Sequence, residues 1–136
     1  MTTFQQWVDS FRSSNLTVTG ITRHYDNPPN SLNTADLPAA WPSIFSGGYG
    51  DYEWSCNELN ETFTMSFVVA CEAVNQNNIP ENYEQMVDIA DNLRTALNTI
   101  DVTTFIRPLQ IQAATVTVAG TAYYGLVCTI EGANSA

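Results

Sequence analysis

Apolar and polar residues alternate most regularly in the second half of the chain. Over residues 62–74 one side of the alternation is entirely apolar and the other is largely polar, and this period of two predicts a long strand. The apolar side comprises Phe63, Met65, Phe67, Val69, Cys71 and Ala73. Residues 110–118 and 121–131 also alternate, and they flank Ala119-Gly120. They predict a second hairpin, with apolar residues on both of its faces.

Two helices are predicted from a different period. Over residues 80–98 the apolar positions step by three and four, and Pro80 stands where its missing N–H is harmless. Acidic residues near the start and Arg94 near the end complement the dipole of this helix. Residues 3–14 show the same spacing over a shorter stretch, and Thr3 with Gln6 forms the pattern of a capping box.

The first half of the chain is less regular. Residues 16–25 are rich in β-branched side chains and predict a strand, which Gly20 interrupts. Residues 51–56 predict the first arm of a hairpin, with its turn at 57–60. Residues 26–50 carry several prolines and no sustained period, which predicts a long loop of the kind that is either functional or disordered. Disordered loops lack large apolar residues, and this one is rich in them, so it must pack against something.

These elements predict an α+β fold in a single domain over residues 1–136. We expect one mainly antiparallel sheet of four to five strands, two helices and a long proline-containing loop, with a frayed tail at 132–136. The strand at 62–74, the helix at 80–98 and the strand from 110 form one crossover connection.

The charge of the chain narrows its possible partners. The chain has fourteen acidic residues, four arginines and no lysine, so its formal net charge is -10. A chain of this kind has no basic patch for a phosphate backbone or an anionic membrane surface. The N-terminal residues lack the pattern of a secretory signal, and no apolar run is long enough for a bilayer. We therefore expect a soluble protein that is made in the cytoplasm and has no membrane partner.

Candidate chemistry is sparse. His24 is the one histidine, and it could form a triad with a cysteine and Asp26, but Cys56, Cys71 and Cys128 lie among apolar strand residues, which is typical of buried, inert thiols. No cysteine–histidine spacing suits zinc, the glycines at 46–51 lack the lysine of a phosphate-binding loop, and the acidic residues at 53–61 match no calcium loop. We predict no catalytic residues, no metal and no cofactor, and a structural role for His24.

The order of elements and one short motif resemble a known family. The N-terminal helix, the strand after it and the segment Asp36-Leu37-Pro38-Ala39-Ala40-Trp41-Pro42 are similar to those of tail terminator (head–tail joining) proteins of long-tailed bacteriophages. The later strand, helix and hairpin fit the same pattern. The resemblance implies a structural virion protein of the neck, without enzymatic activity. It implies a homo-hexameric ring that caps the tail tube, contacts the neighbouring neck and tube proteins, and lets DNA pass without binding it.

The apolar loop is the predicted contact between subunits, because a symmetric ring can bury such a loop against its neighbour. The candidate interface residues are Leu37, Pro38, Trp41, Pro42, Ile44, Phe45 and Tyr49. Among them, Trp41, Ile44 and Phe45 are expected at a subunit contact rather than in the core of the subunit. Two alternatives stay open: another phage assembly component, such as a head-closure or tail tube subunit, or a small ligand-binding domain or enzyme.

Overall fold

A computed structural model describes residues 3–53, 58–74, 79–99 and 105–134. Together they form an α+β fold with one five-stranded, mostly antiparallel sheet and two α-helices, as the sequence predicts. The elements in chain order are α1 (Phe4–Asp9), β1 (Arg23–His24), the 3-10 helix η1 (Thr34–Asp36), β2 (Ala39–Glu53), β3 (Glu58–Ala73), α2 (Ile79–Leu97), β4 (Phe105–Val118) and β5 (Thr121–Asn134).

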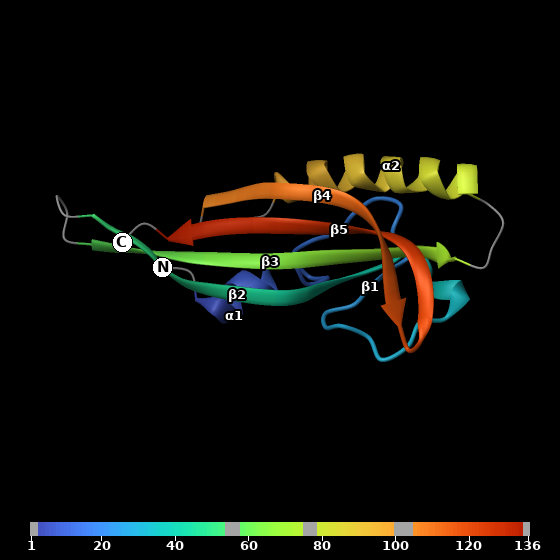
Figure 1. Ribbon diagram of the computed structural model, residues 1–136, viewed down its shortest axis with the longest axis horizontal. Helices are drawn as coiled ribbons and strands as arrows, with labels where there is room; N and C mark the ends of the chain where they lie inside the picture. The colour runs from blue at the N-terminus through green and yellow to red at the C-terminus, as the bar shows by residue number, and fades with distance from the viewer. Residues whose placement is uncertain (1–2, 54–57, 75–78, 100–104, 135–136) are drawn as a thin grey trace.

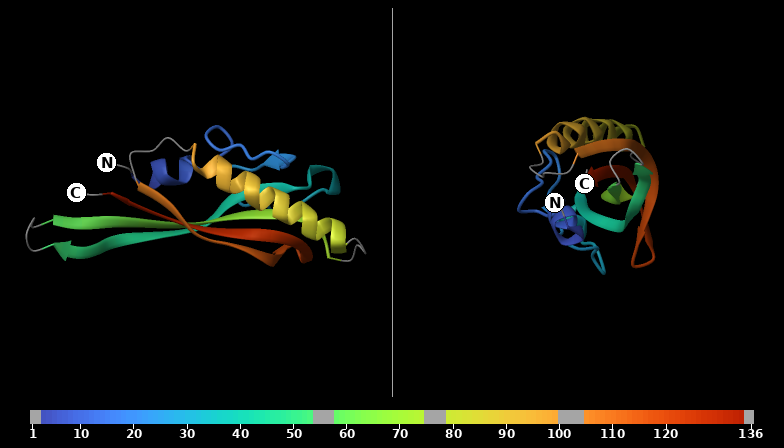
Figure 2. Two further views of the ribbon diagram at one scale, coloured as in Figure 1. Left: turned by 90° about the horizontal axis from the view of Figure 1, so that it is seen from above. Right: turned by 90° about the vertical axis from the view of Figure 1, so that its left-hand side faces the viewer.

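The strands lie side by side in the order β1-β2-β3-β5-β4. β1 is parallel to β2, and the other neighbours are antiparallel. β3 and β4 therefore run in the same direction with β5 between them, and α2 makes the crossover between them that the sequence predicts. The sheet is long and strongly twisted, and α1 and α2 lie on the same side of it (Figures 1 and 2).

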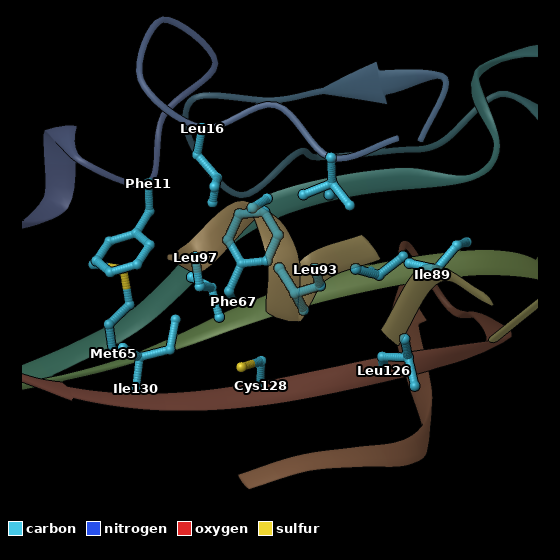
Figure 3. Close-up of a cluster of buried hydrophobic side chains, with 14 of the residues drawn as sticks. Phe11, Leu16, Met65, Phe67, Ile89, Leu93, Leu97, Leu126, Cys128 and Ile130 are labelled. Carbon is cyan, nitrogen blue, oxygen red and sulfur yellow. The ribbon is translucent and has the colours of Figure 1, made fainter. Parts of the chain in front are cut away.

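The main core lies between the sheet and the helices. The alternating side chains of β3 and β5 form its floor, and α2 covers them with Ile89 and Leu93, which are almost fully buried. Trp7 and Phe11 close one end, with their rings 4.9 Å apart in an edge-on contact. Figure 3 shows Phe67, Leu93 and Leu97 directed into the same space. The period of two in β3 and the steps of three and four in α2 place these residues there.

A second, smaller core lies on the opposite face of the sheet. Because successive strand residues point to opposite faces, Val68 and Ala70 turn away from the main core. They pack with Trp41, Val118 and Tyr123, and the side chains of Tyr25, Leu32 and Leu37 cover this cluster. The sheet is therefore covered on both faces near β1.

Several predicted boundaries are wrong. The predicted loop at 26–50 ends at Pro38, because residues 39–53 form β2 and pair with β3 through two register shifts. The predicted strand at 16–25 is reduced to Arg23–His24, because the chain turns at Gly20, where φ is +94°. The predicted helix at 3–14 is an α-helix only over Phe4–Asp9, although its capping box is present.

The ends of the predicted strands also move. The hairpin arm at 51–56 is the end of β2 as far as Glu53, while residues 54–57 lie outside the described part of the chain. Residues 58–60 of the predicted turn belong to β3. The predicted frayed tail is likewise wrong over 132–134, which pair with β3 and β4 as the end of β5. The turn at Ala119-Gly120 is confirmed, and both residues have a positive φ, which suits a two-residue hairpin.

The β2–β3 hairpin extends beyond the rest of the described fold. Its far end reaches past α1 and past the end of β5 (Figures 1 and 2). The start of α2 lies toward the opposite end of the molecule. The far end of the β2–β3 hairpin and the start of α2 therefore lie toward opposite ends of the long axis of the protein.

Candidate interaction surface

The predicted interface residues divide into two groups. Trp41 is 4% exposed and lies in the smaller core, where its ring meets that of Tyr25 edge-on at 6.4 Å. Pro38 and Pro42 are buried, and Leu37 is half-buried against the same cluster. The expectation that Trp41 lies outside the core of the subunit is therefore wrong. The segment that precedes β2 folds back over its own sheet, so this part of the loop already has its packing partner.

Ile44 and Phe45 behave differently. They are 77% and 55% exposed, although they follow Trp41 by only three and four residues. Phe4, at 41% exposure, lies beside Phe45, and its ring is 6.0 Å from that of Phe45 and 5.0 Å from that of Phe63. We call Phe4, Ile44 and Phe45 the β2 patch. Tyr49, the last predicted interface residue, pairs with Glu61 in the β2–β3 ladder, and its side chain lies outside the described part of the structure.

The β2 patch is costly to leave in water. Burying a large apolar side chain stabilises a protein by about 1.5–3 kcal/mol relative to leaving it exposed. A grouping of exposed large apolar side chains on a folded subunit is typical of an interaction site. A register shift between Pro42 and Phe45 marks a bulge at this point of β2. The bulge re-aims the side chains that follow it, which the alternation of the sequence does not reveal.

The edges of the sheet are partly protected. β1 pairs only with Ala39 and Ala40, so among the described residues the outer edge of β2 beyond them has no strand partner. β4 forms the other edge. β2, on the part of its edge that β1 leaves uncovered, and β4 each carry a proline followed by a register shift, at Pro42 and at Pro108. Prolines and bulges are features that discourage edge-to-edge pairing. Side chains are therefore better candidates for a contact than backbone edges.

His24 has the structural role that the sequence predicts. Its Nε2 atom accepts a hydrogen bond from the backbone N–H of Val18 at 3.0 Å. Burial of the imidazole lowers its pKa below the ordinary value. Asp26 does not complete a triad, because its carboxylate accepts hydrogen bonds from the backbone N–H and the hydroxyl of Ser13, at 2.9 and 2.7 Å. These bonds hold the pKa of Asp26 below its usual value.

The cysteines are inert where the structure describes them. Cys71 and Cys128 are free and buried in the main core, and burial raises the pKa of their thiols to about 11 and about 12. Thiols with such values hold almost no nucleophilic thiolate near neutral pH. The prediction of buried thiols is confirmed for these two residues, and Cys56 lies outside the described residues.

The described surface has hollows on both sides of the sheet. One, of about 640 Å³, runs along α2, and the other, of about 320 Å³, lies over Trp41 between Pro28-Pro29 and the turn of the β4–β5 hairpin. His24 lines neither of them.

Within residues 3–53, 58–74, 79–99 and 105–134, no three His, Cys, Asp or Glu side chains are grouped as metal ligands. Neither helix in this part of the chain combines the length and the apolar character that a membrane span requires.

Comparison with known proteins adds no relative. No family model matches the chain, and no curated protein matches it significantly. The functional argument therefore depends on the residues themselves, above all on the β2 patch, and on the resemblance noted in the sequence.

Proposed function

We propose that the protein is a structural subunit of a ring in the neck of a long-tailed bacteriophage, where it caps the tail tube and joins it to the head-closure proteins. The observation that carries the proposal is the β2 patch. The subunit already has two buried clusters of its own, so folding alone does not explain why Ile44 and Phe45 remain in water. An assembly partner explains it.

The sequence resemblance supplies the kind of assembly. The motif at residues 36–42 lies directly before the β2 patch, at the start of the strand that extends from the fold. A contact that places this strand against a different surface of the next subunit is heterologous, and a heterologous contact forms a ring when its rotation closes. The acidity of the chain suits a ring around DNA, because carboxylates repel a passing phosphate backbone.

The proposal is tested by the size of the protein in solution. Six subunits of 15.0 kDa should give a particle of about 90 kDa in size-exclusion chromatography with light scattering. Exchanging Ile44 and Phe45 together for serine should shift the protein to monomers, because losing one aromatic anchor typically weakens an interface by about 2 kcal/mol, or roughly thirtyfold.

Tyr83→Ser provides the matched control. Tyr83 is 62% exposed and lies on α2, away from the β2 patch, so its loss should leave the ring intact. Wild-type protein that stays monomeric at the highest attainable concentration, with chemical cross-linking also giving only monomers, contradicts the ring. Equal loss of assembly in the control and in the double variant contradicts the role of the β2 patch.

A further inference from the structure

A groove with an apolar floor and an acidic rim runs beside α2, far from the β2 patch. It is an open groove of about 640 Å³ between the turn at Gly20 and the part of α2 from Pro80 to Asn92. Gly20, Pro80 and Ile89 supply its apolar lining. Carboxylates supply most of its polar lining, together with the amides of Gln85 and Asn92, and these acids are Glu81, Glu84 and Asp88.

The turn at Gly20 is fixed against the helix. The side-chain amide of Asn92 donates a hydrogen bond to the backbone oxygen of Thr19 at 2.9 Å. Gly20 adopts a φ of +94°, which other residues rarely take, and a Cβ atom built there would meet Ile89 at 3.6 Å. The groove is therefore a formed feature of the fold.

The neighbouring surface of α2 is apolar and unpartnered. Tyr83 and Val87 are 62% and 45% exposed and lie one helical turn apart. Between this pair and the groove runs an acidic stripe with the helical spacing three, four, three. The stripe comprises Glu81, Glu84, Asp88 and Asp91. An apolar pair beside a row of carboxylates is the surface that a cationic amphipathic segment complements.

The chain contains little with which to neutralise this stripe. Arg94 lies 3.5 Å from Asp91, and in the described residues the other three acids have no ion-pair partner. A second copy could offer no lysine, and Arg12 is already bonded to Asp9 and Asn27. Arg23 lies over the ring of Tyr25, with 4.9 Å between its guanidinium carbon and the ring centroid.

We propose that the α2 groove binds a basic, amphipathic segment of a different protein. The aliphatic stems of arginine or lysine side chains lie on Ile89 and Pro80, and their charged heads reach the carboxylates of Glu81, Glu84 and Asp88. Apolar residues of the same segment cover Tyr83 and Val87. This assignment goes beyond the ring and does not require it, because the groove is lined by α2 and the turn at Gly20, whereas the β2 patch lies on α1 and β2.

The probe for this site is a synthetic helical peptide of about 16 residues that presents arginines on one face and leucines on the other. Fluorescence anisotropy measures its affinity at low and at physiological salt. Glu84→Gln combined with Asp88→Asn should weaken binding at least tenfold and reduce its salt dependence. Val87→Ser should weaken binding severalfold, and its effect should not depend on salt.

The matched control removes equal charge elsewhere. Asp51→Asn combined with Glu58→Gln changes the ends of β2 and β3, remote from α2, and should leave the affinity within about twofold. Equal loss in the two double variants would show nonspecific attraction and overturn the proposal. A changed oligomeric state in the Glu84–Asp88 variant, with unchanged peptide binding, would assign the groove to a second copy and also overturn it.

Binding should persist when Ile44 and Phe45 are exchanged for serine, so this result is independent of ring formation. If that variant is monomeric and still binds the peptide, both proposals stand. If the wild type never forms a ring but binds the peptide through Glu84 and Asp88, only the ring fails. If the ring forms and the peptide does not bind, only the groove proposal fails.

Discussion

His24 connects two parts of the N-terminal segment through one hydrogen bond. Its Nε2 atom can accept the N–H of Val18 only while the imidazole is neutral, because protonation would place two donors opposite each other. Burial of the ring also favours the neutral form and lowers its pKa. The folded protein therefore binds fewer protons at this site than the unfolded chain does.

This difference predicts how stability depends on pH. Stability should be fully retained above the unfolded pKa of histidine, about 6.5, and should fall as the pH drops below it toward the lowered folded value. Thermal unfolding at about pH 7.5 and about pH 5.5 measures the change. His24→Gln keeps an acceptor but cannot titrate, so its melting temperature should fall less over this interval. An equal fall in both proteins would assign the pH dependence to other groups.

The burial of some side chains can be predicted from the sequence, and that of others cannot. Cys71 and Cys128 are buried among residues whose alternation is regular, so their inert character follows from the sequence. Trp41 and Phe45 occur in the same short segment, yet one is buried and the other is more than half exposed. The bulge between Pro42 and Phe45 and the return of the preceding loop decide which side chain points inward. Both are tertiary features, which local composition does not encode.

At the scale of whole elements, periodicity decides what can be predicted. β3, α2 and the β4–β5 hairpin have regular patterns, and the structure confirms each of them, with β4 beginning at Phe105 rather than at residue 110. The sequence does not predict β2 over residues 39–50, because Pro42 and the glycines at 47, 48 and 50 are typical of a loop, and because its two register shifts break the alternation. Long pairing with β3 overrides this weak local preference for strand.

The burial of Trp41 predicts a change in the stability of the subunit. Trp41→Ala removes the largest side chain of the smaller core and should reduce the free energy of unfolding by about 3–5 kcal/mol. Phe45→Ser should reduce it by less than about 1 kcal/mol, because that ring is 55% exposed. Urea unfolding of the two variants as monomers makes the comparison. Equal, small losses would show that the loop does not hold Trp41 in the core in solution.

For the whole molecule, charge is the dominant feature. Three of the four arginines have partners in the structure, since Arg12 contacts Asp9, Arg23 lies over Tyr25 and Arg94 faces Asp91, and the side chain of Arg107 lies outside the described part of the structure. The acidic stripe of α2 adds a negative face. The same charge distribution serves both proposals, because it repels a nucleic acid that passes through a ring and attracts a basic protein segment.

This distribution predicts that the protein does not bind duplex DNA. Affinity for a phosphate backbone comes chiefly from releasing counterions when lysine or arginine neutralises phosphates, and a chain with four arginines and a net charge of -10 has almost nothing to contribute. Fluorescence anisotropy with labelled duplex DNA at about 0.15 M salt should show no binding. A variant with Glu81, Glu84 and Asp88 all changed to lysine serves as the positive control. Three adjacent cations on α2 should produce weak binding that salt abolishes. Micromolar affinity of the unaltered protein at that salt would contradict the prediction and the idea of a ring through which DNA slides freely.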